Sequence, residues 1–258
     1  MKIVVAYKWA ANPQDAEVGP DGTVDWSRAK GAVSEYDPVA FELARVLADT
    51  CAGEVVGLTV GAAAIDTPLA RKAALSRGLD SLVMVADDAL RGADGTRIAA
   101  VLAGAVRAIG DVDVVVAGES SVDVGDRQVA MTLAAQLGWA GLNAVRAVTA
   151  DGGSPVVERE VAGGVETVVA GGPVVLAATA DAALPRVPGM KEILGAAKKP
   201  TQVLDLAALD VPAPADTIAP VSTARPDTGN RQGVMLDAAD LPAAAAQLTA
   251  ALRQSGVL

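Results

Sequence analysis

The sequence predicts an α/β fold: a doubly wound, mostly parallel sheet with helices on both faces, extended by antiparallel edge strands and a C-terminal arm. Short runs rich in Val and Ile alternate with segments whose apolar residues recur at helical spacing, which is typical of a parallel sheet covered on both faces. The chain is 52% hydrophobic but only 2% aromatic, so small and β-branched side chains must fill the core between closely packed layers. Because crossover connections are right-handed, this alternation indicates a nucleotide-binding type of domain.

The elements of the first half follow from apolar spacing and turn chemistry. Residues Ile3 to Tyr7 are predicted as a buried strand, and the turn Pro20 to Thr23 joins two short strands in a small hairpin. Asp37-Pro38 supplies an N-cap and a proline at the first helical position, and the helix ends at Gly53. Further predictions are strands at Glu54 to Val60, Leu82 to Val85 and Val112 to Ala117, and helices from Asp66 to near Gly78, about Thr96 to Ile109 and about Asp126 to Leu137.

After Gly138 the pattern changes to consecutive strands separated by glycine turns, which indicates antiparallel pairs at the edge of the sheet. These strands are Ala144 to Thr149, Val156 to Val161, Thr167 to Ala170 and a buried Pro173 to Ala178. Residues 210–233 lack periodicity and are expected to form an extended arm, followed by a helix over Leu241 to Leu252. We therefore expect a main domain over residues 1–205, and over residues 206–258 an arm and helix that pack on a partner.

Composition excludes several classes of function. The 21 basic and 31 acidic residues leave a net charge of −10, which disfavours binding to nucleic-acid backbones and to anionic membranes. The chain has no histidine, which removes imidazole chemistry and most catalytic zinc sites. Its single cysteine, Cys51, excludes an internal disulfide and a cysteine cluster for iron–sulfur or zinc. Its first apolar run is too short for a signal peptide, and no run reaches the roughly 20 apolar residues of a membrane span. We expect a cytoplasmic chain with no metal site.

Ligands of open parallel sheets bind beyond the carboxyl ends of the strands, and four loops qualify here. They begin at Tyr7, Ser34, Thr59 and Gly118. The loop from Gly118 to Gln128 is the richest, because its glycines, hydroxyls and following helix N-terminus could bind a phosphate, with Arg127 as a charged donor. Without a Walker or GxGxxG fingerprint, phosphate binding and plain helix capping are equally supported on residues alone. Asp123 and Asp126 are expected to cap rather than to catalyse.

A second notable stretch runs from Leu184 to Pro200. Two prolines and a glycine stiffen a loop that presents Met190 where a short helix begins, and Lys198-Lys199 lie at the end of that helix. One interpretation is a helix whose lysines complement its C-terminal dipole. The other is a docking loop, because a polarizable Met flanked by charges makes a good anchor on a partner surface.

The residues resemble a known family over nearly the whole chain. The run Val157 to Thr167, followed by Pro173-Val174-Val175 and Pro185-Arg186, resembles the signature of electron transfer flavoprotein beta subunits. Ala6-Tyr7-Lys8 and the Gly118 to Gln128 loop fall at the expected places. The stretches most similar to the Fix-type branch associated with carnitine metabolism are Ser34 to Asp37, Ser76 to Gly78, Gly118 to Ser121 and Met190 to Pro200.

The resemblance implies an adenine nucleotide hydrolase-like fold and an electron carrier rather than an enzyme. It implies a heterodimer with an alpha subunit that holds the redox-active FAD, serving acyl-CoA dehydrogenase-like or carnitine-pathway flavoenzymes. In this family the beta subunit often binds AMP, and in electron-bifurcating relatives a second FAD. By position, the nucleotide site would comprise Ala6, Ser34, Glu35, Tyr36, Asp37, Val60, Asp123, Gly125, Asp126, Arg127, Gln128, Val129 and Ala130. Partner docking would involve Met190, the hydrophobic anchor, with Pro185, Arg186 and Ile193, and Glu160, which matches a carboxylate that pairs with an alpha-subunit arginine.

The ligand loop departs from the family pattern. Relatives that bind the nucleotide tend to show Thr and Gly around the Gln, whereas Arg127-Gln128-Val129-Ala130 stands here, and Ser34 replaces the usual Asn. Losing a hydroxyl and a glycine removes phosphate donors and narrows the backbone approach, so AMP is expected rather than a second FAD. Two alternatives stay open: a stand-alone adenine-nucleotide-binding protein or hydrolase on the same fold, and a structural partner whose pocket has decayed.

Overall fold

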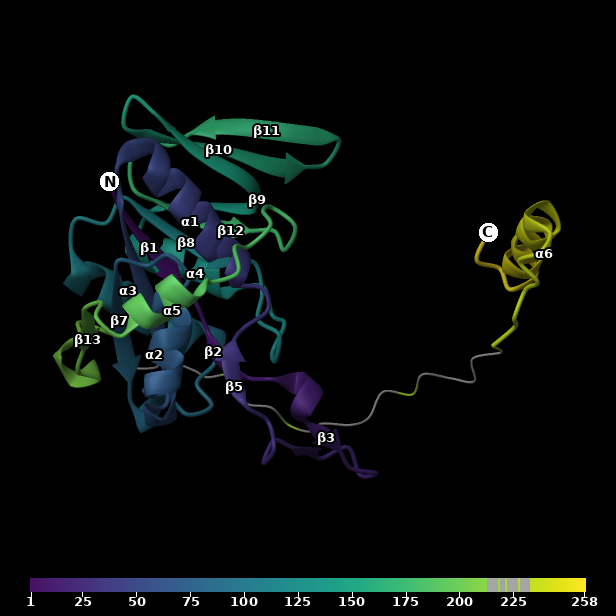
Figure 1. The fold of residues 1–258 in the computed structure, drawn as a ribbon, viewed down its shortest axis with the longest axis horizontal. Helices are drawn as coiled ribbons and strands as arrows, with labels where there is room; N and C mark the ends of the chain where they lie inside the picture. The colour runs from purple at the N-terminus through teal and green to yellow at the C-terminus, as the bar shows by residue number, and fades with distance from the viewer. Residues whose placement is uncertain (213–217, 219–220, 222–226, 228–232) are drawn as a thin grey trace.

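A nine-stranded mixed sheet organises the computed structural model, which describes residues 1–212, 218, 221, 227 and 233–258 (Figure 1). The strand order is β11-β10-β9-β12-β8-β1-β6-β7-β13. The strands are β1 (Lys2–Ala6), β6 (Glu54–Gly61), β7 (Ser81–Ala86), β8 (Val114–Gly118), β9 (Ala140–Asp151), β10 (Ser154–Val161), β11 (Gly164–Val169), β12 (Val174–Ala178) and β13 (Thr201–Val203). The helices are α1 (Pro38–Cys51), α2 (Pro68–Leu75), α3 (Gly95–Ile109), α4 (Val129–Leu137), α5 (Met190–Ala196) and α6 (Leu241–Gln254). The predicted α/β architecture is confirmed.

The chain reverses its winding direction at β1. After β1 it builds β6 and then β7 on one side, crosses back through α3, and adds β8 and then β12 on the other side. All of the pairings β1–β6, β6–β7, β1–β8 and β8–β12 are parallel. The boundary between β1 and β8 is therefore the topological switch point, where doubly wound sheets leave a crevice beyond the carboxyl ends of the strands.

Helices cover both faces of the sheet, and the pleat of the strands divides the core between them. In β1, Ile3 and Val5 face the layer of α1 and α2, whereas Val4 and Ala6 face the layer of α3 and α4. This alternation is the period of two expected of a strand that is buried on both sides. Alanines such as Ala99 and Ala103 of α3 are fully buried, which lets the helices approach the valine-rich strands closely.

The antiparallel extension lies beside β12. β9 runs parallel to β12 and antiparallel to β10, and β10 pairs antiparallel with β11. The β10–β11 hairpin forms the upper edge of the sheet in Figure 1. A smaller excursion follows β1, where β2 (Trp9–Ala11) pairs with β5 (Gly31–Val33) and β3 (Glu17–Val18) pairs with β4 (Val24–Asp25). Both predicted antiparallel features are confirmed.

Two helix starts differ from the sequence-based expectation. α4 begins at Val129, not near Asp126, because Gly125 and Arg127 have φ angles of 73° and 55°, which a right-handed helix does not contain. At the start of α1, Asp37 makes no side-chain capping hydrogen bond, because its carboxylate is directed to the neighbouring strand ends instead.

The C-terminal region has two parts within the described residues. Leu206, Leu209 and Val211 pack against the α3 and α4 side of the core. Helix α6 lies apart from the sheet in Figure 1 and contains no buried residue. Most of the predicted arm, residues 210–233, lies outside the described residues. None of the helices that the structure describes combines the length and the apolar run that crossing a bilayer requires.

Candidate functional site

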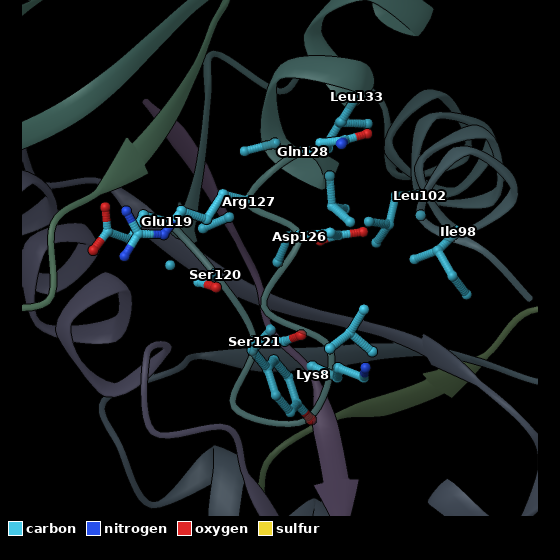
Figure 2. A pocket seen from close by; sticks show the side chains of 18 of the residues that line it. Lys8, Ile98, Leu102, Glu119, Ser120, Ser121, Asp126, Arg127, Gln128 and Leu133 are labelled. Carbon is cyan, nitrogen blue, oxygen red and sulfur yellow. The ribbon is translucent and has the colours of Figure 1, made fainter. Parts of the chain in front are cut away.

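A pocket opens at the switch point, on the side of the sheet covered by α3 and α4. It lies between the carboxyl ends of β1 and β8, the loop after β8, and the N-terminal ends of α3 and α4 (Figure 2). The pocket has a volume of about 160 Å³, counted as the space that the centre of a water molecule can reach. The lining residues are Ala6, Tyr7, Lys8, Asp37, Val60, Ala93, Asp94, Gly95, Ile98, Leu102, Ala117, Gly118, Glu119, Ser120, Ser121, Val124, Asp126, Arg127, Gln128, Val129, Ala130 and Leu133.

The floor of the pocket depends on a close approach between β8 and the start of α1. A Cβ atom at Gly118 would lie 2.4 Å from the carbonyl oxygen of Tyr36 and 2.8 Å from Oδ1 of Asp37, so only glycine fits there. Asp37 is buried, and its Oδ2 accepts a hydrogen bond of 2.7 Å from the backbone N–H of Lys8. The end of β8 lies against the other carboxylate oxygen, because a Cβ on Gly118 would be 2.8 Å from Oδ1. One side chain therefore joins the ends of both strands at the switch point.

The loop after β8 is held over the pocket by two contacts. Lys8 Nζ forms an ion pair of 2.7 Å with Asp123, and the backbone N–H of Val122 donates to Ser34 Oγ over 3.2 Å. Positive φ angles at Gly125 and Arg127 turn the chain back toward α4. These contacts give the loop a defined path although most of its residues are exposed.

The two helix N-termini at the pocket differ in their capping. Asp94 caps α3, since its Oδ1 accepts a hydrogen bond of 2.8 Å from the backbone N–H of Arg97. The carboxylate of Asp126 also lies against this end, where a Cβ on Gly95 would be 2.9 Å from Oδ2. At α4, Gln128 occupies the cap position without a side-chain hydrogen bond. The positive end of the α4 dipole is therefore the better placed of the two to bind an anion.

One wall of the pocket is apolar. Ile98 and Leu102 from α3 and Leu133 from α4 lie on the side of the pocket opposite Glu119 in Figure 2. Ala6 and Ala117 from the strand ends continue this surface. An apolar wall beside a cluster of polar groups is the arrangement expected of a site for a small organic ligand.

The pocket is lined by charges of both signs, of which Lys8 forms an ion pair with Asp123. Burial raises the pKa of the Asp37 carboxyl from 3.8 to about 7, against the lowering effect of the Lys8 and Gly118 backbone N–H groups. The pKa of Tyr7 lies above its ordinary value, mainly because the phenol is buried and to a smaller extent because Asp37 is negatively charged. The Tyr7 hydroxyl is buried and has no hydrogen-bond partner among the residues that the structure describes. Arg127 enters no ion pair with any described residue, so its guanidinium is available to an anionic ligand.

The pocket brings together eight of the residues expected at the nucleotide site. They are Ala6, Asp37, Val60, Asp126, Arg127, Gln128, Val129 and Ala130. The others lie behind or beside it: Ser34 supports the loop, Asp123 pairs with Lys8, and Glu35, Tyr36 and Gly125 are not among the lining residues.

The contribution of α3 to the pocket lining was not predicted from the sequence. Ala93, Asp94 and Gly95 follow β7 in the chain, and a glycine next to a capping Asp beyond a parallel strand is the signal that could have identified them. Lys8 was expected only as part of the loop that begins at Tyr7, and no role in the site was predicted for its side chain.

The residues expected at the docking loop have different environments. Met190 is 71% exposed at the first position of α5, while Ile193 is half-buried and its neighbour Leu194 is 64% exposed. Arg186 is anchored on the domain, because its guanidinium forms hydrogen bonds of 2.8 and 2.7 Å with both carboxylate oxygens of Glu42 in α1. Pro185 lies between Arg186 and the 92% exposed Leu184.

The side chain of Lys199 binds the end of α2 rather than the end of α5, the helix that precedes it. Its Nζ donates to the carbonyl oxygens of Leu75 and Leu79, at 3.0 and 2.5 Å, and so completes the C-terminal end of α2. Of the two interpretations of this stretch, the one in which both lysines complement the preceding helix therefore does not describe Lys199. The contact ties the end of α5 to α2.

Glu160 lies far from the pocket, in the outer hairpin. It belongs to β10, its side chain is half exposed, and Oε1 is 3.8 Å from Arg146 Nη1 of β9. At this distance and exposure the ion pair is weak, so the carboxylate remains accessible to another cation.

The family comparison covers most of this architecture. The model of the electron transfer flavoprotein domain matches residues 21–209, a range that begins before α1 and continues beyond β13. It includes the loop after β8 and the N-terminal ends of α3 and α4, which contribute most of the pocket lining. By this match the chain belongs to the electron transfer flavoprotein family.

Proposed function

We propose that this chain is the beta subunit of a heterodimeric electron transfer flavoprotein, and that an alpha subunit holds the redox-active FAD. Members of the family are electron carriers that generally bind FAD, and they act with flavoenzymes rather than on a substrate of their own. The protein part of such a function is to position the cofactor and to select partners.

The observation that carries the proposal is helix α6. It has 14 residues, none of them buried, and its Leu241 and Leu248 are 70% and 49% exposed. Isolated helices of this length are marginal in water, since most helical stability in proteins comes from packing an apolar face. A partner subunit that covers α6 would supply that packing, and the same subunit would meet Glu160 with a basic side chain.

A second exposed surface supports docking of a flavoenzyme. Leu184, Val187, Met190 and Leu194 are between 64% and 92% exposed along the loop before α5 and on its first turns; we call this set the apolar ridge. The Arg186–Glu42 pair within this segment and the Lys199 contacts after it attach the ridge to the domain. A rigid, Met-containing apolar surface suits an acyl-CoA dehydrogenase-like or carnitine-pathway partner, because its side chains would be covered without reordering the loop.

The switch-point pocket is proposed to bind AMP. Its residues fit a nucleotide with one phosphate: an apolar wall for the base, the uncapped α4 N-terminus and the Arg127 guanidinium for the phosphate, and the hydroxyls of Ser120 and Ser121 nearby. The carboxylates of Glu119 and Asp126 disfavour a more highly charged ligand. AMP bound here would have a structural role, because none of the lining groups is arranged as a nucleophile with a neighbouring base.

Coexpression with a candidate alpha subunit tests the proposal. We expect the two chains to copurify as a heterodimer that releases one FAD and one AMP on denaturation, as measured by mass spectrometry. Truncation at residue 233 should abolish copurification while leaving the folded domain intact by circular dichroism. A stable monomer that does not bind the alpha subunit would contradict the proposal. ATP turnover by the isolated chain that is lost in Arg127→Ala would favour a stand-alone nucleotide hydrolase.

A further inference from the structure

Asp37 occupies a place in the fold that helix capping does not explain. It is the residue before α1, yet its carboxylate makes no capping hydrogen bond to that helix. Instead it is buried at 4% exposure, accepts the backbone N–H of Lys8, beyond β1, and lies against Gly118, at the end of β8. These two strands flank the switch point and pair directly as far as Ala6 and Ala117, and beyond that pairing this one side chain links their ends.

We infer that Asp37 is the positioning residue of the nucleotide pocket, where its carboxylate holds the end of β1 beside the end of β8 in the arrangement that admits the ligand. The inference rests on the proposed nucleotide site. Lys8 is held twice, by its backbone N–H on Asp37 and by its Nζ on Asp123. Through Lys8, the carboxylate therefore also determines where the loop that covers the pocket is attached.

The ionised carboxylate is the form that offers both oxygens as acceptors, although burial raises the pKa of Asp37 to about 7. Two backbone N–H groups approach it, and an asparagine or a protonated acid offers one good acceptor oxygen and one donor group. The second N–H would then face a donor in a buried site, which costs far more than the mere loss of a hydrogen bond. The charged and titratable groups around Asp37 are Lys8 and Tyr7 from the end of β1, Asp123 from the loop after β8, and Glu119 next to Gly118. Of these, Lys8 favours the ionised form and Asp123 opposes it.

The chain contains a matched control at the opposite end of the same two strands. Asp113, just before β8, accepts a hydrogen bond of 2.8 Å from the backbone N–H of Lys2 in β1. It therefore links β1 and β8 as Asp37 does, but at their amino ends, away from the pocket. Asp113→Asn makes the same change of side chain at the exposed, opposite end of these strands without touching the proposed site.

The test compares the wild-type heterodimer with Asp37→Asn and Asp113→Asn by AMP titration and by amide hydrogen exchange. We expect Asp37→Asn to bind AMP at least about tenfold more weakly, with faster exchange at the amides of Lys8 and Gly118, while Asp113→Asn binds AMP as the wild type does. Between pH 8 and pH 6 the AMP affinity of the wild type should fall relative to that of Asp37→Asn. Protonation of AMP itself is shared by all three proteins and cancels in this ratio.

The outcomes separate this inference from the proposed function. If the wild type binds no AMP, the proposed nucleotide site fails, and amide exchange at Lys8 and Gly118 still decides whether Asp37 holds the strand ends. If AMP binds to the wild type and to Asp37→Asn equally well with the same pH profile, the positioning role is refuted while the site stands. Equal losses in Asp37→Asn and Asp113→Asn would also refute it, because the effect would then be one of general stability.

Discussion

Replacing Gly118 by alanine tests the close approach that forms the pocket floor. The added Cβ would lie 2.4 Å from the carbonyl oxygen of Tyr36 and 2.8 Å from Oδ1 of Asp37. Unstrained C···O contacts are about 3.3 Å or longer, so the Tyr36 carbonyl and β8 must separate by about 1 Å. Overpacking of this kind costs about 1–3 kcal/mol, and the upper part of that range applies because the obstructing atom belongs to the backbone rather than to a flexible side chain.

Urea unfolding followed by circular dichroism measures this cost, and AMP titration measures its effect on the pocket. The matched control is Gly171→Ala, since a Cβ there has no neighbour within 4 Å and the residue does not have a positive φ. We expect Gly118→Ala to lower the free energy of unfolding by about 2–3 kcal/mol and to weaken AMP binding. Gly171→Ala should leave stability unchanged or raise it by at most about 1 kcal/mol. Wild-type stability and AMP affinity in Gly118→Ala would refute the steric argument.

Three further predictions concern charge, partner docking and loop anchoring. Because burial raises the pKa of Asp37 from 3.8 to about 7, the folded chain keeps a proton that the unfolded chain loses, so the free energy of unfolding should fall as pH rises from about 4 to 7. The difference is at most roughly 4 kcal/mol, and comparison of urea curves for wild type and Asp37→Asn across this range should show it as a slope that the variant lacks. Met190→Glu should slow electron transfer from a partner dehydrogenase about tenfold at unchanged melting temperature, because this 71% exposed side chain contributes to the apolar ridge. Val18→Glu, at a 52% exposed site on β3, serves as the control. Equal rates in the wild type and both variants would exclude docking through Met190. Arg186→Ala should remove the side-chain hydrogen bonds to Glu42. Because Arg186 is half exposed, the free energy of unfolding should fall by only about 1 kcal/mol, or the melting temperature by about 2–4 °C. Proteolysis between Leu184 and Met190 should become faster, and an unaltered cleavage rate would show that the pair does not fix the loop.

Periodicity predicted the sheet and its helices because these elements are buried on defined faces. The valine-rich runs became β1, β6, β7, β8 and β12, and the glycine turns after Gly138 became the antiparallel extension. Periodicity could not place the start of α4, because the sequence Asp126-Arg127-Gln128 is compatible with a helix and the positive φ of Arg127 depends on contacts of the whole loop. The element boundaries therefore failed where tertiary contacts override local preference.

The candidate site shows the same division at the level of single residues. The loop from Gly118 to Gln128 could be singled out because glycines and hydroxyls after a strand are a local signal. Asp37 was expected to be a helix cap, which is the ordinary role of an aspartate before Pro38. Its contacts with Lys8 and Gly118 join residues 29 and 81 positions away in the chain, and no local pattern reports them.

The sequence by itself determined the fold class, the position of the antiparallel edge and the absence of histidine-based chemistry, because burial pattern and composition are properties of local segments. The tertiary structure alone decided which loops meet at the switch point, that α3 contributes to the pocket, that Lys199 completes α2, and that Arg186 is bound to Glu42 of α1. These features depend on strand order, which brings distant segments to the same edge of the sheet.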